Sequence, residues 1–201
     1  MRKTDLKKHI ILLLFTVSII LLCSCSSNEG DDTHFIHAMG FQKEGQEYII
    51  FSVCEKFEKD KSDYFLIEQR GKSIEEALDK IQKEYEGCYF ATIKYYFIPS
   101  EFDESFIANI AKEICDSNIL PSKNSICLVS NTSVKDFMGQ IKSSNDTKKI
   151  KKELHGKSTN TIKFFSQYTS DKVFKATFLS SHDNGTTTAK EKVILSDNKG
   201  E

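Results

Sequence analysis

The sequence lacks the motifs that usually mark an enzyme or a nucleotide-binding protein. It has no glycine-rich phosphate loop, no nucleophile elbow and no His-Glu-x-x-His string. It has six cysteines but no Cys-x-x-Cys pair and no zinc-finger spacing. These absences favour a non-enzymatic protein, and the sequence predicts neither a cofactor nor a metal site.

The sequence also lacks a large excess of positive or negative charge, because the formal net charge is only −1. A nucleic-acid-binding protein requires a clustered basic face, so the sequence predicts no nucleic-acid partner. The lysine-rich residues 142–158 are expected to form a loop or a solvated helix. A contact of these lysines with anionic lipid headgroups is the less favoured alternative.

Three combinations of reactive side chains have structural explanations. His34 and His37 are three residues apart on a predicted strand, so their side chains point to opposite faces and do not share a metal. Ser181-His182-Asp183 contains the residue types of a hydrolytic triad, but adjacent residues in a turn cannot form its spatial relay. The carboxylate pairs Glu75-Glu76 and Glu84-Glu86 are explained by helix capping and solvation.

No apolar run is long enough for a good permanent transmembrane helix. The run Ile10–Leu22 holds 13 residues, which as a helix would span about 20 Å, against about 30 Å for a bilayer core. It follows a basic start and precedes Leu22-Cys23-Ser24-Cys25, an order typical of a bacterial lipoprotein signal peptide. The sequence therefore predicts cleavage before Cys25 and acylation of its thiol.

Two alternatives to this prediction remain, an uncleaved anchor and an ordinary signal peptide, and either would still export the domain. Cys23 is a poor acylation site, because bulky Leu22 would then occupy the position that needs a small side chain.

The predicted organisation has three parts. Residues 1–24 are a lipoprotein signal peptide, 25–33 a flexible polar tether, and 34–201 a single mixed α/β domain. Cleavage would leave 177 residues, enough for one domain with a real core, and would move the formal charge to −4. The expected location is the extracytoplasmic face of a membrane, with the lipid bilayer as partner through acylated Cys25.

The fold class predicted is α/β, a mixed α+β arrangement in which one mixed sheet combines antiparallel meander strands with crossover helices. The meander is predicted from three short aromatic and β-branched segments, 35–42, 48–57 and 64–69. Strand segments 89–98 and 126–129 alternate with helical patterns, which is typical of crossover units on parallel strands. A hairpin is predicted from 173–179 and 188–195 around Asn184-Gly185.

Helix starts are marked by capping residues. Ser73 with Glu76 forms a predicted capping box in which each satisfies the other's amide, and its helix buries a stripe that ends at Tyr85. Ser100 with Asp103 and Ser133 with Asp136 are expected to open two further helices. A short helix at 159–168 is expected to turn three side chains inward, namely Ile162, Phe165 and Tyr168.

Four cysteines follow the predicted cleavage site: Cys54, Cys88, Cys115 and Cys127. Export permits disulfides. Cys54, Cys115 and Cys127 lie in apolar segments and resemble small buried hydrophobes, so free thiols are favoured.

The order of these parts resembles a known family. The segments that carry the resemblance are the lipidated cysteine, Ala38-Met39-Gly40-Phe41, the helix start Gly71-Lys72-Ser73-Ile74-Glu75-Glu76-Ala77-Leu78, Tyr95-Tyr96-Phe97-Ile98-Pro99-Ser100-Glu101 and Ile126-Cys127-Leu128-Val129-Ser130-Asn131. Over about residues 25–180 the chain is similar to the N-terminal domain of the Ger(x)C family of spore-germination lipoproteins, the C subunits of germinant receptors.

The resemblance implies a non-enzymatic lipoprotein on the outer face of the spore inner membrane. Its implied partners are the other germinant receptor membrane subunits, one of them polytopic, and Cys25 is the one functional residue that carries over. Family members usually have an aromatic residue after the lipidated cysteine, where this chain has Ser26-Ser27. They also continue through two later domains, so we expect a shortened paralogue or a truncated gene. The alternative function is a generic surface lipoprotein for solute binding or envelope interaction.

Overall fold

A computed structural model describes residues 33–58, 61–170, 173–181 and 187–195. Contacts divide the chain after Asp32, and all described residues belong to the second unit, Thr33–Glu201. The predicted signal peptide and Cys25 lie outside the described residues. The fold below is that of the second unit alone.

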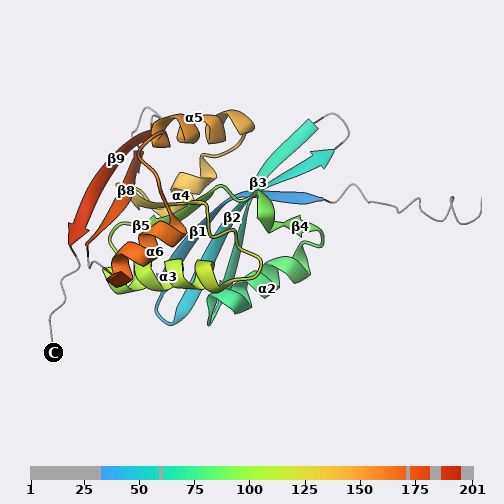
Figure 1. The fold of residues 1–201 in the computed structure, drawn as a ribbon. Helices are drawn as coiled ribbons and strands as arrows, with labels where there is room; N and C mark the ends of the chain where they lie inside the picture. The colour runs from blue at the N-terminus through green and yellow to red at the C-terminus, as the bar shows by residue number, and fades with distance from the viewer. Residues whose placement is uncertain (1–32, 59–60, 171–172, 182–186, 196–201) are drawn as a thin grey trace, which may run out of the picture. The chain divides into compact units, whose positions relative to one another are not determined.

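The described residues form one mixed sheet in the order β3-β2-β1-β5-β6-β8-β9, with β4 beside β1 and β7 beside β6 (Figure 1). The strands are β1 (His34–Glu44), β2 (Glu47–Glu58), β3 (Lys61–Gly71), β4 (Cys88–Tyr89), β5 (Tyr95–Pro99), β6 (Ser125–Ser130), β7 (Thr159–Asn160), β8 (Val173–Ser181) and β9 (Thr187–Leu195). Strands β1, β5, β6 and β8 are parallel, whereas β1–β2–β3 is an antiparallel meander and β8–β9 an antiparallel hairpin. The predicted mixed α/β fold is therefore confirmed.

Helices cover both faces of the sheet (Figure 1). They are α2 (Ile74–Glu84), the 3-10 turn η1 (Phe90–Thr92), α3 (Glu104–Asp116), α4 (Val134–Gly139), α5 (Ser144–Leu154) and α6 (Thr161–Ser170). One core packs α2, α3 and α6 on the sheet, and a second core packs α4 and α5 on the opposite face. Because both faces are covered, every residue of β5 is buried, as expected for an inner parallel strand.

The helix starts follow the capping residues with two corrections. Ser73 caps α2 by accepting a hydrogen bond from the Glu76 amide, but the Glu76 carboxylate accepts from the amide of Lys72 at 2.9 Å rather than from that of Ser73. Ser133 caps α4 as predicted. Helix α3 is capped by Asp103, which accepts from the Phe106 amide at 2.7 Å, so the prediction that Ser100 opens this helix was wrong.

The continuous strand predicted for 89–98 is interrupted. It divides into β4, η1 and β5, and both strands pair with β1. The interruption buries Phe90 and Ile93 in the core that faces α2, and the Thr92 hydroxyl donates to the carbonyl of Ile36 at 2.9 Å. A segment buried on both faces has no polar alternation, so its sequence carries no signal for the break.

Two helical faces also differ from expectation. Residues 144–154 are not a fully solvated segment, because α5 buries Thr147, Ile150 and Leu154. In α6 the most buried apolar side chain is Phe164, whereas Ile162, predicted to point inward, is 44% exposed. The predictions for Phe165 and Tyr168 hold in part, since both are partly buried against the core.

Helix α4 lies unusually close to the middle of β1. A Cβ added at Gly40 would overlap the side chains of Met138 and Val134, both on α4. The close packing of this helix on the sheet therefore requires a residue without a side chain.

We predict that Gly40→Ala lowers the free energy of unfolding by about 1–3 kcal/mol, because the added methyl group overpacks the core. Urea-induced unfolding followed by circular dichroism measures this change. Gly139→Ala is the matched control, since an added Cβ there meets no atom within 4 Å. Equal stability of Gly40→Ala and the native chain would contradict the close packing.

Candidate functional site

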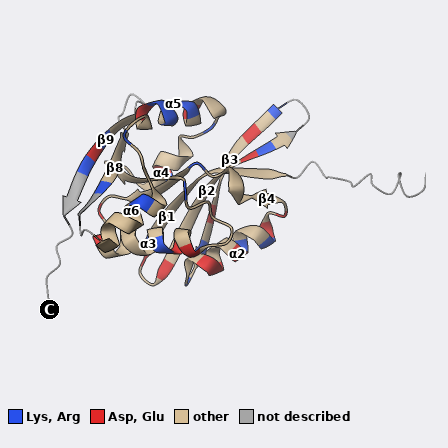
Figure 2. Ribbon diagram, viewed as in Figure 1, with Lys and Arg blue, Asp and Glu red and all other residues tan. Residues whose placement is uncertain are grey.

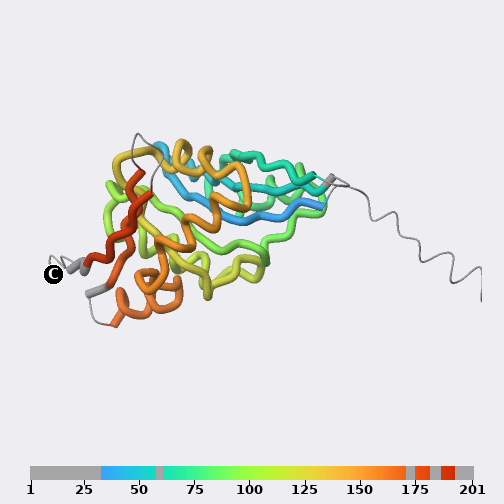
Figure 3. Tube along the Cα trace, turned by 90° about the horizontal axis from the view of Figure 1, so that it is seen from above, coloured from blue at the N-terminus to red at the C-terminus, as the bar shows by residue number. Residues whose placement is uncertain are grey.

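Cys25, the acylation site predicted from the sequence, lies outside the described residues. The described fold begins at Thr33, and β1 starts at His34. The end of the sheet where β1 begins is therefore the part of the domain closest to Cys25 along the chain. Figure 3 shows this end, where β1 lies beside the β2–β3 hairpin.

The two histidines of β1 lie on opposite faces of the sheet, as predicted. The ring of His34 contacts Phe65 and Tyr85, which pack against the core on the α2 face. The ring of His37 stacks on Tyr64, which packs against the core on the α4 face. The two imidazoles cannot share one metal ion in this arrangement.

His37 belongs to a polar cluster with Glu55 and Tyr64. Pairing of β1 with β2 shifts register between Ile36 and Ala38, which places His37 in a β-bulge. Its Nε2 atom lies 2.6 Å from Glu55 Oε2, and both side chains are largely buried. Burial, followed by a hydrogen bond to Glu55, holds the pKa of Tyr64 above its ordinary value.

The contacts of this cluster indicate a structural role. The buried carboxylate of Glu55 has two partners, the imidazole and the phenol, and pairing is what makes burial of a carboxylate tolerable. The bulge aims the imidazole at Glu55 and so connects β1 to β2 through side chains as well as through the backbone.

We predict that His37→Ala lowers the free energy of unfolding by about 3 kcal/mol, because it leaves Glu55 buried without its nearest partner. Chemical denaturation measures the loss. The control is Arg70→Ala, which removes surface ion pairs with Glu44 and Glu68 and should cost less than about 1 kcal/mol. Similar losses in the two variants would show that the His37–Glu55 pair does not stabilise the fold.

All four described cysteines are free. Cys54 and Cys127 are buried, as predicted, whereas Cys115, which was also predicted to be buried, is partly exposed, as is Cys88. The thiols of Cys54 and Cys88 interact across the α2 face of the sheet. This hydrogen bond and burial raise the pKa of Cys54, while the same hydrogen bond lowers the pKa of Cys88.

The remaining two thiols are less acidic than a free cysteine. Burial raises the pKa of Cys127, and burial together with the charge of Asp116 raises the pKa of Cys115. Since the thiolate is the reactive form, the lowered pKa of Cys88 favours its reaction over that of the other three described thiols.

We predict that, of the four described thiols, iodoacetamide alkylates Cys88 first in the folded protein at mildly alkaline pH. Its depressed pKa gives it the largest thiolate fraction, and it is partly exposed. Peptide mass spectrometry over time gives the order, and Cys88→Ser should leave Cys115 as the fastest of the remaining described thiols. Alkylation of Cys127 at the rate of Cys88 would contradict the prediction.

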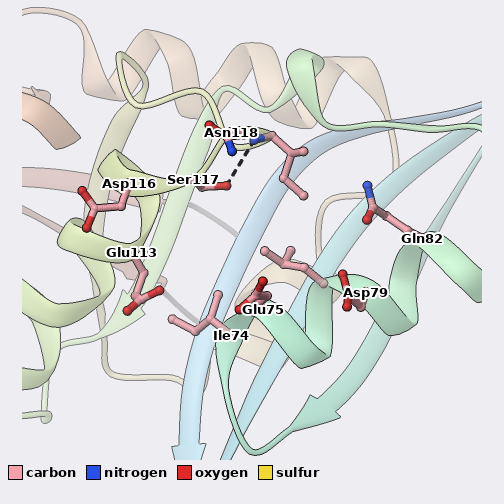
Figure 4. A pocket seen from close by; sticks show the side chains of 10 residues that line it. Ile74, Glu75, Asp79, Gln82, Glu113, Asp116, Ser117 and Asn118 are labelled. Carbon is pink, nitrogen blue, oxygen red and sulfur yellow. Dashed lines mark hydrogen bonds between the residues drawn. The ribbon is translucent and has the colours of Figure 1, made fainter.

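A shallow groove of about 350 Å³ lies between α2 and the end of α3 (Figure 4). Its floor is apolar, with Ile74 and Leu78 from α2. Carboxylates line it from both helices, Glu75 and Asp79 from α2 and Glu113 and Asp116 from α3. Figure 2 shows this acidic character of α2 and α3, in contrast to the basic residues on α5.

Outside the groove, the described residues offer few groups that could form a catalytic or metal site. Of Ser181-His182-Asp183, the structure describes Ser181, whose hydroxyl donates to Gln140 Oε1 at 3.2 Å, and the other two lie outside the described residues. Among the described residues, no group of three or more His, Cys, Asp or Glu side chains could hold a metal ion.

None of the helices in the described part of the chain combines the length and the apolar character needed to cross a membrane.

Comparisons of the chain with models of protein families, with curated protein sequences and with solved structures found no match. The resemblance to the Ger(x)C family therefore rests on the sequence segments alone.

Sequence reasoning missed both the polar cluster and the groove. A signal for the cluster was present in Glu55, because this residue interrupts the apolar segment that precedes it in β2. The groove brings together α2 and α3, which are separated by three short elements, and no local pattern reports such a contact.

Proposed function

We propose that this protein is a lipoprotein, acylated on Cys25 and anchored to the extracytoplasmic face of a membrane, and that it serves as a non-enzymatic subunit of a nutrient germinant receptor in spore germination. The observation that carries the anchoring is the run Leu22-Cys23-Ser24-Cys25 after a basic start and a short apolar segment. Acyl chains such as palmitate hold a protein stably on a bilayer when two or more are present.

The short segment between Cys25 and the start of the described fold is consistent with this anchoring. Seven residues, 26–32, separate Cys25 from Thr33. A chain of this length spans about 28 Å at most when extended and about 16 Å on average as a flexible coil. The domain would therefore stay within about its own diameter of the lipid surface.

The receptor role is supported by the resemblance, whose segments have defined structural roles in this fold. Gly40 permits the close packing of α4, Ser73 caps α2, and the segment Ile126–Ser130 belongs to inner strand β6. A non-enzymatic subunit acts through surfaces, and the α2–α3 groove is a concave surface of this kind, with an apolar floor and acidic walls.

The second candidate is a generic surface lipoprotein for solute binding or envelope interaction. The observation that favours it is the volume of the same groove, about 350 Å³, which falls within the range of small-molecule sites. This candidate predicts protein in growing cells rather than in spores.

We predict that Cys25→Ala moves the protein from the spore membrane fraction to the soluble fraction, because it removes the thiol that accepts the lipid. Antibody detection after fractionation of spores and growing cells measures this shift, and mass spectrometry of the native protein gives the added acyl mass. Cys23→Ala is the matched control and should leave the protein in the membrane.

Two outcomes would contradict the proposal. An unmodified thiol at the mature amino terminus, or membrane-bound Cys25→Ala, would remove the lipid anchor. Expression confined to growing cells would remove the germinant receptor role and leave the second candidate.

A further inference from the structure

Three aromatic rings form an exposed patch at the end of the sheet where β1 begins. We call Phe35, Phe57 and Tyr89 the aromatic patch. Phe35 on β1 pairs with Tyr89 on β4, and the two rings stack with centroids 5.5 Å apart. On the other side, Phe35 meets the ring of Phe57 on β2 edge to face at 5.4 Å.

The aromatic patch is not part of either core. Phe57 and Tyr89 are 51% and 53% exposed, which makes them the two most exposed large apolar side chains among those whose exposure the structure describes. None of the three rings belongs to the two buried clusters. They pack on one another and leave one side open to the surroundings.

The area of the patch is small for a protein interface. An aromatic side chain buries about 150–250 Å² when fully covered, so the patch offers on the order of 300 Å² of open aromatic surface. A stable protein interface needs about 800 Å² from each partner. A partner already held close by another attachment could use a patch of this size.

The aromatic patch lies close in sequence to the proposed lipid anchor, and this position indicates a partner that the anchor already holds nearby. Phe35 is ten residues after Cys25, and a flexible chain of that length has an average span of about 17 Å. The acyl chains would keep the patch at high local concentration near the bilayer surface, so even a weak contact would be occupied.

We infer that the aromatic patch docks on the lipid bilayer and places its rings at the level of the headgroups. This inference rests on the proposed acylation of Cys25. Tyrosine is enriched at membrane interfaces because its ring is apolar and its hydroxyl remains hydrated, and phenylalanine contributes apolar area on interfacial surfaces. Docking would orient the domain with the start of β1 toward the membrane and the far ends of β1 and β2 away from it.

The chain contains no tryptophan, so a single substitution gives a reporter without background. Native acylated protein carrying Phe57→Trp or Tyr89→Trp is reconstituted into vesicles of phosphatidylcholine and phosphatidylglycerol with brominated acyl chains. We expect each reporter to lose most of its emission relative to vesicles without bromine, because bromine quenches tryptophan on contact.

The matched control is Tyr48→Trp, which lies at the opposite end of β2. Tyr48 and Phe57 are nine positions apart in the sequence, or about 30 Å along the strand, so the emission of the Tyr48→Trp reporter should not change. Adding Phe57→Asp to the Tyr89→Trp chain should restore the emission of that reporter, because a carboxylate opposes insertion of the patch. Acylation is verified by mass spectrometry on each preparation.

The outcomes separate this inference from the proposed function. Acylated protein whose Phe57→Trp and Tyr89→Trp reporters are not quenched would overturn the docking and leave the lipid anchor intact. Equal quenching of all three reporters would also overturn it, because the contact would have no orientation. Protection of the reporters from aqueous iodide without quenching by bromine would also overturn it and assign the patch to a contact with a second copy of the chain, since no other protein is present in the vesicles. Protein without an acyl chain on Cys25 would overturn both proposals.

Discussion

Strand β1 is the constraint on which the rest of the structure depends. It pairs with β2 along one edge and with β4 and β5 along the other, so it joins the antiparallel meander to the parallel half of the sheet. The middle of β1 is buried on both faces, in the core that contains α2 and in the core that contains α4. The bulge at His37 and the missing side chain at Gly40 are the two local adjustments that let one strand satisfy all of these neighbours.

The start of the same strand relates the fold to the proposed anchoring. Polar and aromatic groups gather there, with His37, Glu55 and Tyr64 in a cluster joined by contacts to the Glu55 carboxylate and the aromatic patch beside it. The buried carboxylate is paired, as the cost of burying a lone charge demands. The open rings have no such partner within the described fold, and a surface supplied from outside the domain would cover them.

The α2–α3 groove lies on the face opposite the polar cluster and combines an apolar floor with four carboxylates. These properties suit a ligand or protein segment that carries both apolar and basic groups. The proposed acylation of Cys25 would supply a contact with the membrane, and this concave surface would supply a contact with a partner. In that arrangement the domain would hold a partner near the membrane without performing chemistry itself.

The sequence by itself determined the mixed sheet, the meander, the hairpin and the starts of α2 and α4. Alternation and helix capping are local properties, and capping by residues such as Ser73 and Ser133 depends only on their neighbours in the sequence. Only the tertiary structure decided the break at η1, the buried face of α5 and the inward turn of Phe164. It also decided the meeting of Glu55 with His37 and of α2 with α3. These features depend on which distant segments pack together, and a contact across a sheet leaves no periodic trace in either segment.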